Sequence, residues 1–213
     1  MMHALTIRLP EQYRRRGPDF PAIAFFQGEG QFANQCRPVQ ADPDSGDPFE
    51  RSLAASRPHA QLRMLEDDIG GAFALIWLTE AEYAAGPTVP PVDVRRAGEH
   101  GNDDEGPNAW DDPMPMTAVW LGIRNDPNAG LAPSTSENSG YRQRYNPETR
   151  GWHGWAENLY GRCHLGGTTF YVQAMPQGLT PFYLELEEFG GLNLGGGNAQ
   201  IDLDSDTFDW ACG

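Results

Sequence analysis

Glycine and proline interrupt this 213-residue chain so often that no apolar segment is long. The sequence contains 25 glycines and 18 prolines, and both residues are typical of turns and of the ends of helices and strands. The apolar runs between them are about 4 to 8 residues long, which is the length of a strand. Hydrophobic residues make up 39% of the chain, enough for a core at this length. The sequence therefore predicts an α+β, β-rich fold with mainly antiparallel sheets, one or two short helices and two long loops.

Most of the predicted strands are apolar runs that end at glycine, proline or asparagine. Residues 73–78, FALIWL, are apolar throughout, which is typical of a central strand. Residues 182–186, FYLEL, alternate between apolar and polar positions, which indicates a strand with two unlike faces. The remaining strands are expected at residues 5–9, 21–26, 116–123, 168–174, 200–203 and 208–212.

Two segments predict helices. Residues 49–68 place several large apolar side chains near one helical face, although Pro58 must break or kink a helix there. Thr79 and Glu82 have the spacing of a capping box, which predicts a brief helical turn that ends at Gly86.

We expect a single domain over residues 1–213. It would comprise an N-terminal half over 1–96, an acidic loop over 97–116 and a C-terminal antiparallel meander over 160–213. Glycine-containing turns separate the strands of the meander, which we expect to have one apolar and one acidic face. Residues 125–150 predict the second long loop, and loops of this length are usually functional or disordered.

Acidic residues outnumber basic residues by 30 to 15, which gives a net charge of −15. A charge of this sign repels phosphates, so it argues against nucleic acid as a ligand and favours a basic protein partner. Acidity also keeps a domain soluble, which is the alternative explanation. All 15 basic residues are arginine, and the absence of lysine is a feature of GC-rich genomes that suggests a bacterial source.

Two regions, residues 97–123 and 163–213, contain several acids and no arginine. The first is rich in glycine, proline and asparagine, which predicts a loop, and the acids of the second alternate with apolar residues, which predicts the outward face of strands. An exposed Trp110 would anchor a basic partner that the acids attract, or its ring could instead be tucked under the loop. The residues expected to contact the partner are Asp103, Asp104, Glu105, Trp110, Asp111, Asp112, Glu185 and Glu187.

The other tryptophans divide into two pairs. Trp77 and Trp120 lie inside apolar runs, so we expect both rings in the core. Trp152 and Trp155 flank a glycine near the end of the second loop. For this pair, a binding role and a role in holding the loop down both stay open.

The sequence offers few groups for catalysis or metal binding. Cys163 and His164 are adjacent, so in a strand their side chains would point to opposite faces. A zinc site made from these two residues and His153 lacks a fourth ligand. The acidic turns at 42–47 and 202–206 lack the bidentate glutamate of a calcium loop, which leaves only weak calcium binding open. We therefore expect no catalytic residue, no metal site, no cofactor and no enzymatic activity.

The cysteines and the N-terminus bear on localisation. The three cysteines are far apart and form no CxxC motif, which favours reduced thiols in a cytosol. The N-terminus has no apolar run followed by a cleavage site, and no apolar run approaches the roughly 20 residues of a spanning helix. We therefore expect a cytoplasmic protein that does not contact a membrane.

Glycine-centred motifs in the C-terminal third resemble a known family. Residues 164–173, HLGGTTFYVQ, are similar to the GG-x-P-x-W-I-Q stretch of the YwqG-like family of bacterial domains of unknown function. Residues 182–187, 195–201 and 208–212 resemble that family's aliphatic strand, its G-D-G-G turn and its closing strand. The resemblance does not extend before residue 160.

This resemblance implies a β-rich fold with a few helices, and it supplies no catalytic residues. Thr169, Tyr171 and Glu185 stand where the family usually has proline, tryptophan and glutamine. Domains of this kind also occur in bacterial loci that encode secreted toxins, where a small acidic neighbour neutralises the toxin. A shared fold does not by itself fix the function.

Together these observations favour a bacterial immunity protein, an acidic binding domain that occludes the active site of a basic cognate toxin. Two other functions stay open. One is a hydrolase that uses acidic residues and His164, and the other is a module that binds a small ligand. A stoichiometric basic partner recovered from a native lysate would favour the immunity protein over both.

Overall fold

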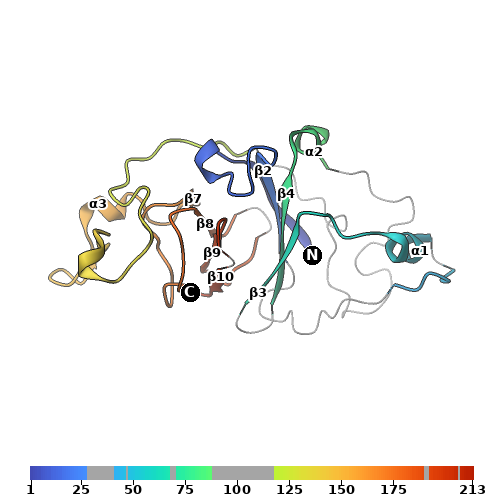
Figure 1. Ribbon diagram of the computed structural model, residues 1–213. Helices are drawn as coiled ribbons and strands as arrows, with labels where there is room; N and C mark the ends of the chain where they lie inside the picture. Colours follow the sequence, from blue (N-terminus) through green and yellow to red (C-terminus); the bar gives the residue numbers. More distant parts are fainter. Residues whose placement is uncertain (28–40, 47, 68–70, 88–117, 190–191, 206) are drawn as a thin grey trace. The chain divides into compact units, whose positions relative to one another are not determined.

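The computed structural model describes the chain except for residues 28–40, 47, 68–70, 88–117, 190–191 and 206 (Figure 1). The chain divides into two compact units. The first unit contains Met1–Glu11 and Arg16–Ala118, and the second contains Gln12–Arg15 and Val119–Gly213. Each unit is built on a four-stranded antiparallel sheet, coloured blue to green in the first unit and orange to red in the second (Figure 1).

The first sheet is formed by the apolar runs of the N-terminal half. Its strands are β1 (Met2–Arg8), β2 (Ala22–Gln27), β3 (Leu62–Glu66) and β4 (Ala72–Leu78), in the order β1-β2-β4-β3. The two central strands supply the core, where Phe25 stacks on Phe73 and the ring centroids are 6.0 Å apart. Ile23, Leu75 and Trp77 are buried with them. The strands predicted at 5–9, 21–26 and 73–78 and the buried position of Trp77 are confirmed.

The helical turn that follows β4 has the predicted caps. Helix α2 spans Glu80–Ala85, and the Thr79 hydroxyl accepts the backbone N–H of Glu82. In return, the Glu82 carboxylate accepts the backbone N–H of Thr79 at 2.7 Å, which completes the capping box. Gly86 ends the helix with a φ of 70°, a value that glycine adopts without strain.

The helix predicted over residues 49–68 is wrong beyond its first half. Helix α1 spans Pro48–Ala55, and the chain leaves the helical conformation before Pro58. The following residues form β3, the edge strand that pairs with β4. Leu65 is buried and Met64 is exposed, as the two-residue period of a strand requires. The apolar residues of this segment suit a strand as well as a helix because each piece is too short to fix a period.

The second unit begins with a largely irregular segment and ends in a meander. Residues 125–150, predicted as a long loop, contain only a short 3-10 helix, η3, and the first strand of a two-stranded hairpin. The elements of this unit are η3 (Glu137–Ser139), β5 (Tyr145–Asn146), β6 (Gly151–Trp152), α3 (Gly154–Glu157), β7 (His164–Leu165), β8 (Tyr183–Glu187), β9 (Asn198–Asp202) and β10 (Phe208–Ala211). The order β10-β9-β8-β7 confirms the predicted antiparallel meander.

The register of the meander separates apolar from polar side chains. Residues directly opposite each other on neighbouring strands share a face. Glu185 of β8 pairs with His164 of β7 and with Gln200 of β9, so these three side chains form a row across the sheet. The apolar face contains Leu165, Leu184, Leu186, Ala199, Ile201, Phe208 and Trp210. Both faces of β8 and β9 are largely buried, so the two-faced pattern is right and the outward orientation of the acidic face is wrong.

Two predicted strands are not formed. Residues 118–123 are exposed and irregular, with Trp120 at 90% of its full exposure, so the expectation that Trp120 lies in the core is wrong. Residues 168–174 form no strand either, although 168–170 are buried. Their backbone groups bond to side chains rather than to a neighbouring strand, for reasons given below.

The β-rich fold with antiparallel sheets is confirmed, and the described residues contain three short α-helices. The expectation of a single domain over residues 1–213 stays a prediction. Within the residues that the structure describes, no helix has the length and apolar character needed to span a membrane.

Candidate functional site

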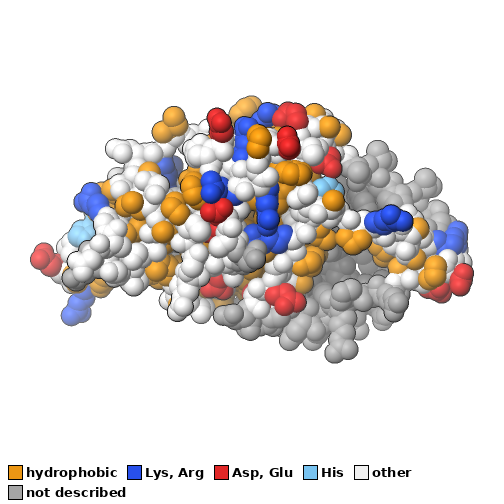
Figure 2. Space-filling view, in the orientation of Figure 1, with side chains coloured by type: hydrophobic (Ala, Val, Ile, Leu, Met, Phe, Trp, Pro, Cys, Tyr) orange, Lys and Arg blue, Asp and Glu red, His pale blue; other side chains and the backbone are white. Residues whose placement is uncertain are grey.

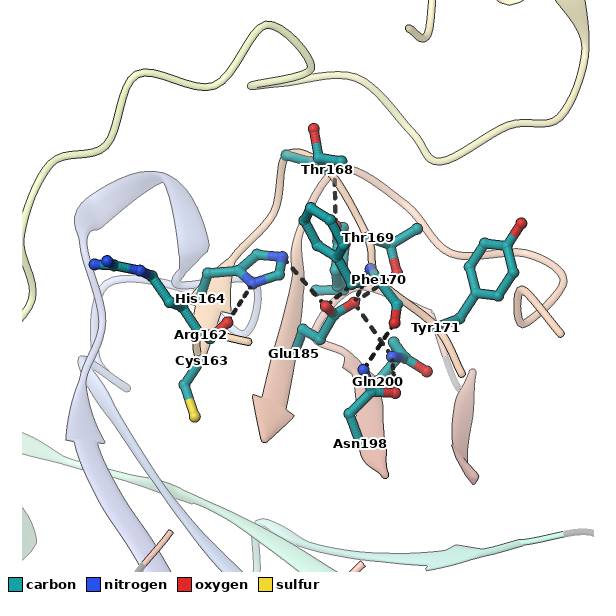
Figure 3. A network of polar contacts seen from close by, with 12 residues as sticks. Arg162, Cys163, His164, Thr168, Thr169, Phe170, Tyr171, Glu185, Asn198 and Gln200 are labelled. Atoms are coloured by element: carbon teal, nitrogen blue, oxygen red, sulfur yellow. Dashed lines mark hydrogen bonds and ion pairs between the residues drawn. The ribbon is translucent and has the colours of Figure 1, made fainter. Parts of the chain in front are cut away.

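Residues 166–171 lie at the centre of a buried polar network in the second unit (Figure 3). A buried backbone N–H or C=O without a partner is costly, and here side chains supply most of the partners. We call these side chains the cradle, and residues 166–171 the cradled segment. The cradle consists of Asp126, Tyr141, Arg144, Tyr183, Glu185 and Asn198.

Asp126 joins the irregular segment after residue 119 to the cradled segment. Its carboxylate accepts the backbone N–H and the hydroxyl of Thr168, at 2.8 and 2.7 Å, and the backbone N–H of Asn128 at 2.9 Å. Arg124 forms an ion pair with it at 2.6 Å, and only 2% of the carboxylate side chain is exposed. Burial alone would raise the pKa of Asp126, but these donors outweigh burial and lower it. Asp126 is therefore a buried, fully bonded anion.

Two tyrosine hydroxyls hold the carbonyl of Gly167. Tyr183 and Tyr141 donate to this oxygen at 2.9 and 3.2 Å, and the Tyr141 oxygen accepts the backbone N–H of Thr169 at 2.8 Å. Burial raises the pKa of both tyrosines, so both hydroxyls keep their protons and donate. Gly167 has a φ of 84°, and a Cβ there would collide with the Asp126 carboxylate, so this position requires glycine.

Arg144 holds the far end of the cradled segment. Its guanidinium donates to the carbonyls of Thr169 and Tyr171, at 2.8 and 3.1 Å, and lies 3.8 Å from the centre of the Tyr171 ring. Trp152 packs beside it, and Trp152 and Trp155 also pack against a small core of Ala156, Leu159 and Phe170. Both tryptophans are partly buried in this way, which favours the role of holding the second loop down.

Glu185 is fully buried at the centre of β8. Its carboxylate accepts the Thr169 hydroxyl at 2.5 Å, the backbone N–H of Phe170 at 2.9 and 3.0 Å, and the Gln200 amide at 3.2 Å. Burial raises the pKa of Glu185 to about 7, although these donors act in the opposite direction. Glu185 therefore binds a proton far more tightly than an ordinary glutamate.

His164 faces Glu185 from the neighbouring strand (Figure 3). The His164 Nε2 atom lies 3.8 Å from Glu185 Oε1, and the ring Nδ1 atom lies 2.9 Å from the Arg162 carbonyl oxygen. Among the described residues, Nε2 has no hydrogen-bond partner. Burial lowers the pKa of His164 to about 4, and the nearby Arg124 charge acts in the same direction. The histidine is therefore neutral at physiological pH.

A buried acid with a raised pKa beside a buried histidine with a lowered pKa is an arrangement that can hold a proton. Such opposed shifts cluster at functional sites, although structural networks also produce them. The Glu185 side chain is 0% exposed and that of His164 is 4% exposed. The site is therefore closed, and the chemistry that its geometry supports is proton binding inside the fold.

The structure places two of the sequence-predicted contact residues. Glu185 was expected on an outward face, and this is wrong because the cradled segment covers that face of β8. Glu187 is partly buried on the same face, where its carboxylate lies 3.4 Å from the Asn198 amide. The other predicted contacts, Asp103, Asp104, Glu105, Trp110, Asp111 and Asp112, lie outside the described residues.

Several acids of the second unit have structural roles. Asp202 is fully buried and accepts the backbone N–H groups of Thr180, Asp204 and Ser205. Glu188 accepts two backbone N–H groups in the turn that precedes β9. Together with Asp126 and Glu185, these residues explain why a stretch rich in acids is not a uniformly acidic surface.

The candidate metal ligands and the candidate nucleophile do not converge. Cys163 is exposed and points away from His164, as two adjacent strand residues should (Figure 3). Although the residue as a whole is exposed, its sulfur contacts the Glu187 backbone, and this partial burial raises the pKa of the Cys163 thiol and disfavours the reactive thiolate. Within the described part of the chain, no three His, Cys, Asp or Glu side chains are placed to hold a metal ion.

Sequence reasoning missed the cradle as a unit. A signal was present in the strands, because β8 and β9 carry polar residues at alternate positions beside apolar neighbours. Glu185 and Glu187 of β8 face Gln200 and Asn198 of β9. That pattern shows which side chains share a face, but it does not show that a non-strand segment covers them.

Comparison of the chain with models of protein families, with curated proteins and with solved structures found no match. The resemblance of residues 164–212 to the YwqG-like family therefore stays a prediction.

Proposed function

We propose that this protein is an acidic protein-binding domain that acts as a bacterial immunity protein. It would neutralise a basic cognate toxin by occluding the toxin's active site. The observation that carries the proposal is the uneven charge of the two units. The first unit contains 19 acids and 8 arginines, and the second contains 11 acids and 7 arginines. An excess of this kind attracts a basic partner over long distances and speeds its association.

Most of the acids that the structure describes in the first unit are exposed. Figure 2 shows acidic side chains gathered over α2, where Glu80 pairs with Arg8 and Glu82 pairs with His59 at the surface. The exposed acids described in this unit are Glu11, Asp19, Asp42, Asp44, Glu66, Glu80 and Glu82. The second unit, in contrast, uses Asp126, Glu185 and Asp202 internally.

An apolar stretch follows the acidic loop directly in the sequence. Val119, Trp120, Leu121 and Ile123 are all exposed, and Trp120 is the largest of them. Binding sites often combine charged groups that attract the partner with a few large apolar side chains that supply affinity. The succession of acids at 103–112 and apolar residues at 119–123 has both parts.

The first test recovers the partner and then removes the negative charges of the acidic loop. The full chain should capture a basic protein from a native lysate at a stoichiometric ratio and inhibit its activity. The variant D103N/D104N/D111N/D112N should then bind at least about tenfold more weakly at 0.15 M salt or below, because steering and contact both depend on these charges.

A matched control changes the same number of charges elsewhere. The variant E11Q/D19N/E148Q/E157Q removes four exposed acids outside the loop. Because it lowers the net negative charge by the same amount, this control should slow association to a similar degree but keep more of the affinity than the loop variant, as measured by stopped-flow kinetics and calorimetry on both variants. Equal affinities for the loop variant and the wild-type chain would remove the acidic loop from the proposal.

Trp120→Ala tests whether the exposed apolar stretch at 119–123 contacts the partner. Because the ring is 90% exposed, its removal should leave the free energy of unfolding within about 0.5 kcal/mol of the wild-type value. Partner affinity should fall by about 2 kcal/mol or more if the ring is an anchor. Val172→Ala, which shortens another exposed apolar side chain, is the control. Unchanged affinity in Trp120→Ala would exclude the anchor.

A hydrolase is the second candidate, and one observation favours it. The fold brings together an acid, Glu185, and the histidine that the sequence offered, His164, at 3.8 Å. Hydrolysis of chromogenic ester, phosphate or glycoside substrates that is abolished by Glu185→Gln in a folded protein would support this function. Because both side chains are closed off from solvent, the binding domain explains the described geometry better.

A further inference from the structure

The position of the ring hydrogen in the buried pair formed by Glu185 and His164 can be assigned from the neighbouring groups. The Arg162 carbonyl oxygen can only accept, so the His164 Nδ1 atom that lies 2.9 Å from it must carry a hydrogen. A neutral ring has one N–H, so Nε2 is then a bare acceptor. This acceptor is buried, and no described residue lies within hydrogen-bond geometry of it. Glu185 Oε1 lies 3.8 Å away, and the Thr168 backbone also lies near the ring.

The two Glu185 oxygens differ in their surroundings. Oε2 accepts the Thr169 hydroxyl and the Gln200 amide and shares the Phe170 N–H. Among the described residues, Oε1 accepts only that shared N–H. Oε1 is also the atom that faces His164. A proton on Oε1 would point toward the bare Nε2 atom, and an approach of about 1 Å would complete a hydrogen bond between them.

The charges around the pair disfavour ionisation of either partner. Arg124 stands near His164 and opposes an imidazolium, while Asp126 acts more weakly in the opposite direction. The Glu187 carboxylate, on the same strand face, disfavours ionisation of Glu185 because the two negative charges repel each other. The other titratable or charged groups of the network are Tyr141, Arg144 and Tyr183. The two tyrosine hydroxyls are neutral, and Arg144 bonds to the carbonyls of Thr169 and Tyr171.

We infer that Glu185 and His164 form a proton-binding site inside the second unit, in which Glu185 Oε1 holds the proton and donates it in a hydrogen bond to the neutral His164 ring at Nε2. This site is independent of the proposed binding function. Glu185 also bonds to Thr169 and Phe170 of the cradled segment. The protonation state of Glu185 therefore makes the stability of these interactions depend on pH. When the proton leaves near neutral pH, a buried anion and an unpaired ring nitrogen remain, and the second unit loses stability.

Nitrogen NMR of the full chain with ¹⁵N-labelled histidine tests this site directly. Between pH 5.5 and 8.5, His164 should stay neutral with its proton on Nδ1, because burial lowers the pKa of the ring to about 4. The Nε2 resonance should move in a single step near pH 7 as Glu185 loses its proton. The signals of His164 are assigned by their loss in His164→Asn.

Two variants identify the carboxyl responsible for the step. Glu185→Gln should abolish it, and Glu187→Gln, which changes the partly buried neighbour on the same face, should retain it. A ring with its proton on Nε2, a wild-type Nε2 resonance that does not move, or loss of the step in Glu187→Gln would overturn the inference. If Glu185→Gln does not fold, the wild-type titration and Glu187→Gln still decide.

Discussion

Replacing Asp126 with alanine should destabilise the second unit by about 3 to 5 kcal/mol, because it leaves several buried donors without an acceptor. The carboxylate accepts two bonds from Thr168 and one from Asn128, and it neutralises Arg124. Its loss leaves the bonds from the Asn128 side-chain amide to the Arg142 carbonyl and the Thr168 hydroxyl, so the segment around Asn128 is held to the cradled segment by fewer bonds. Urea unfolding of the full chain, followed through NMR signals of β8 and β9, measures the effect in this unit.

Asp204→Ala is the matched control for this loss. Asp204 pairs with Arg15 at 3.1 Å, and about a third of each of these two side chains is exposed. A partly exposed pair of this kind contributes about 0 to 1 kcal/mol. Equal costs for Asp204→Ala and Asp126→Ala would mean that the cradle does not hold the unit together.

The pH dependence of the Asp126 effect follows from its lowered pKa. A carboxyl whose pKa is lower in the folded state stabilises the fold above its ordinary pKa of 3.8, and this contribution is lost as the pH falls through the folded value. The difference between wild type and Asp126→Ala should therefore shrink in acid. Asp126→Asn keeps the shape of the side chain but places an amide among donors. It should therefore lower the free energy of unfolding, but by less than Asp126→Ala does.

Local patterns were sufficient to predict much of the scaffold. The apolar runs that became β2 and β4, and the alternation that became β8, have few alternatives because buried strands need such residues. Thr79 and Glu82 predicted a capping box because that motif depends only on residues close in sequence. These predictions depend on local preferences, which a single sequence displays directly.

The cradle could not be predicted in the same way. Alternation in β8 assigns Glu185 to the face opposite Leu184 and Leu186, and an antiparallel sheet commonly leaves one face in solvent. Whether that face is covered depends on the cradled segment, whose backbone bonds to side chains from four separate parts of the chain. The alternation around Phe170 suggested a strand because local pattern does not show where backbone bonds go.

Residues 118–123 were expected to be buried and are exposed, whereas Glu185 was expected to be exposed and is buried. The run from Ala118 to Ile123 contains the apolar residues expected of a buried strand, yet Val119, Trp120 and Ile123 are exposed. Apolar composition indicates that a surface prefers to leave water, but it does not say which surface covers it. A partner could cover such a stretch as well as the chain's own core.

Replacing either partner of the Glu185–His164 pair should make the stability of the second unit depend on pH. The slope should be negative in one variant and positive in the other. In His164→Asn, only the raised pKa of Glu185 remains. A pKa that is higher in the folded state favours folding at low pH, and this contribution is lost as the pH rises from 4.5 through about 7. The unit should lose about 3 kcal/mol over this window relative to its value at pH 4.5. Asparagine can still donate to the Arg162 carbonyl that the ring bonds.

In Glu185→Gln, only the lowered pKa of His164 remains. A base whose pKa is lower in the folded state must be neutral to fold, so stability should rise by about 3 kcal/mol as the pH increases from about 4 to 6.5. In the wild-type chain the two contributions oppose each other between pH 4.5 and 6.5, so the pair adds little net slope there. Urea unfolding at several pH values, with each variant compared with wild type, removes the contribution of the other titrating groups. Slopes of the same sign in both variants would show that the two groups do not titrate as the buried acid and the buried base that their positions require.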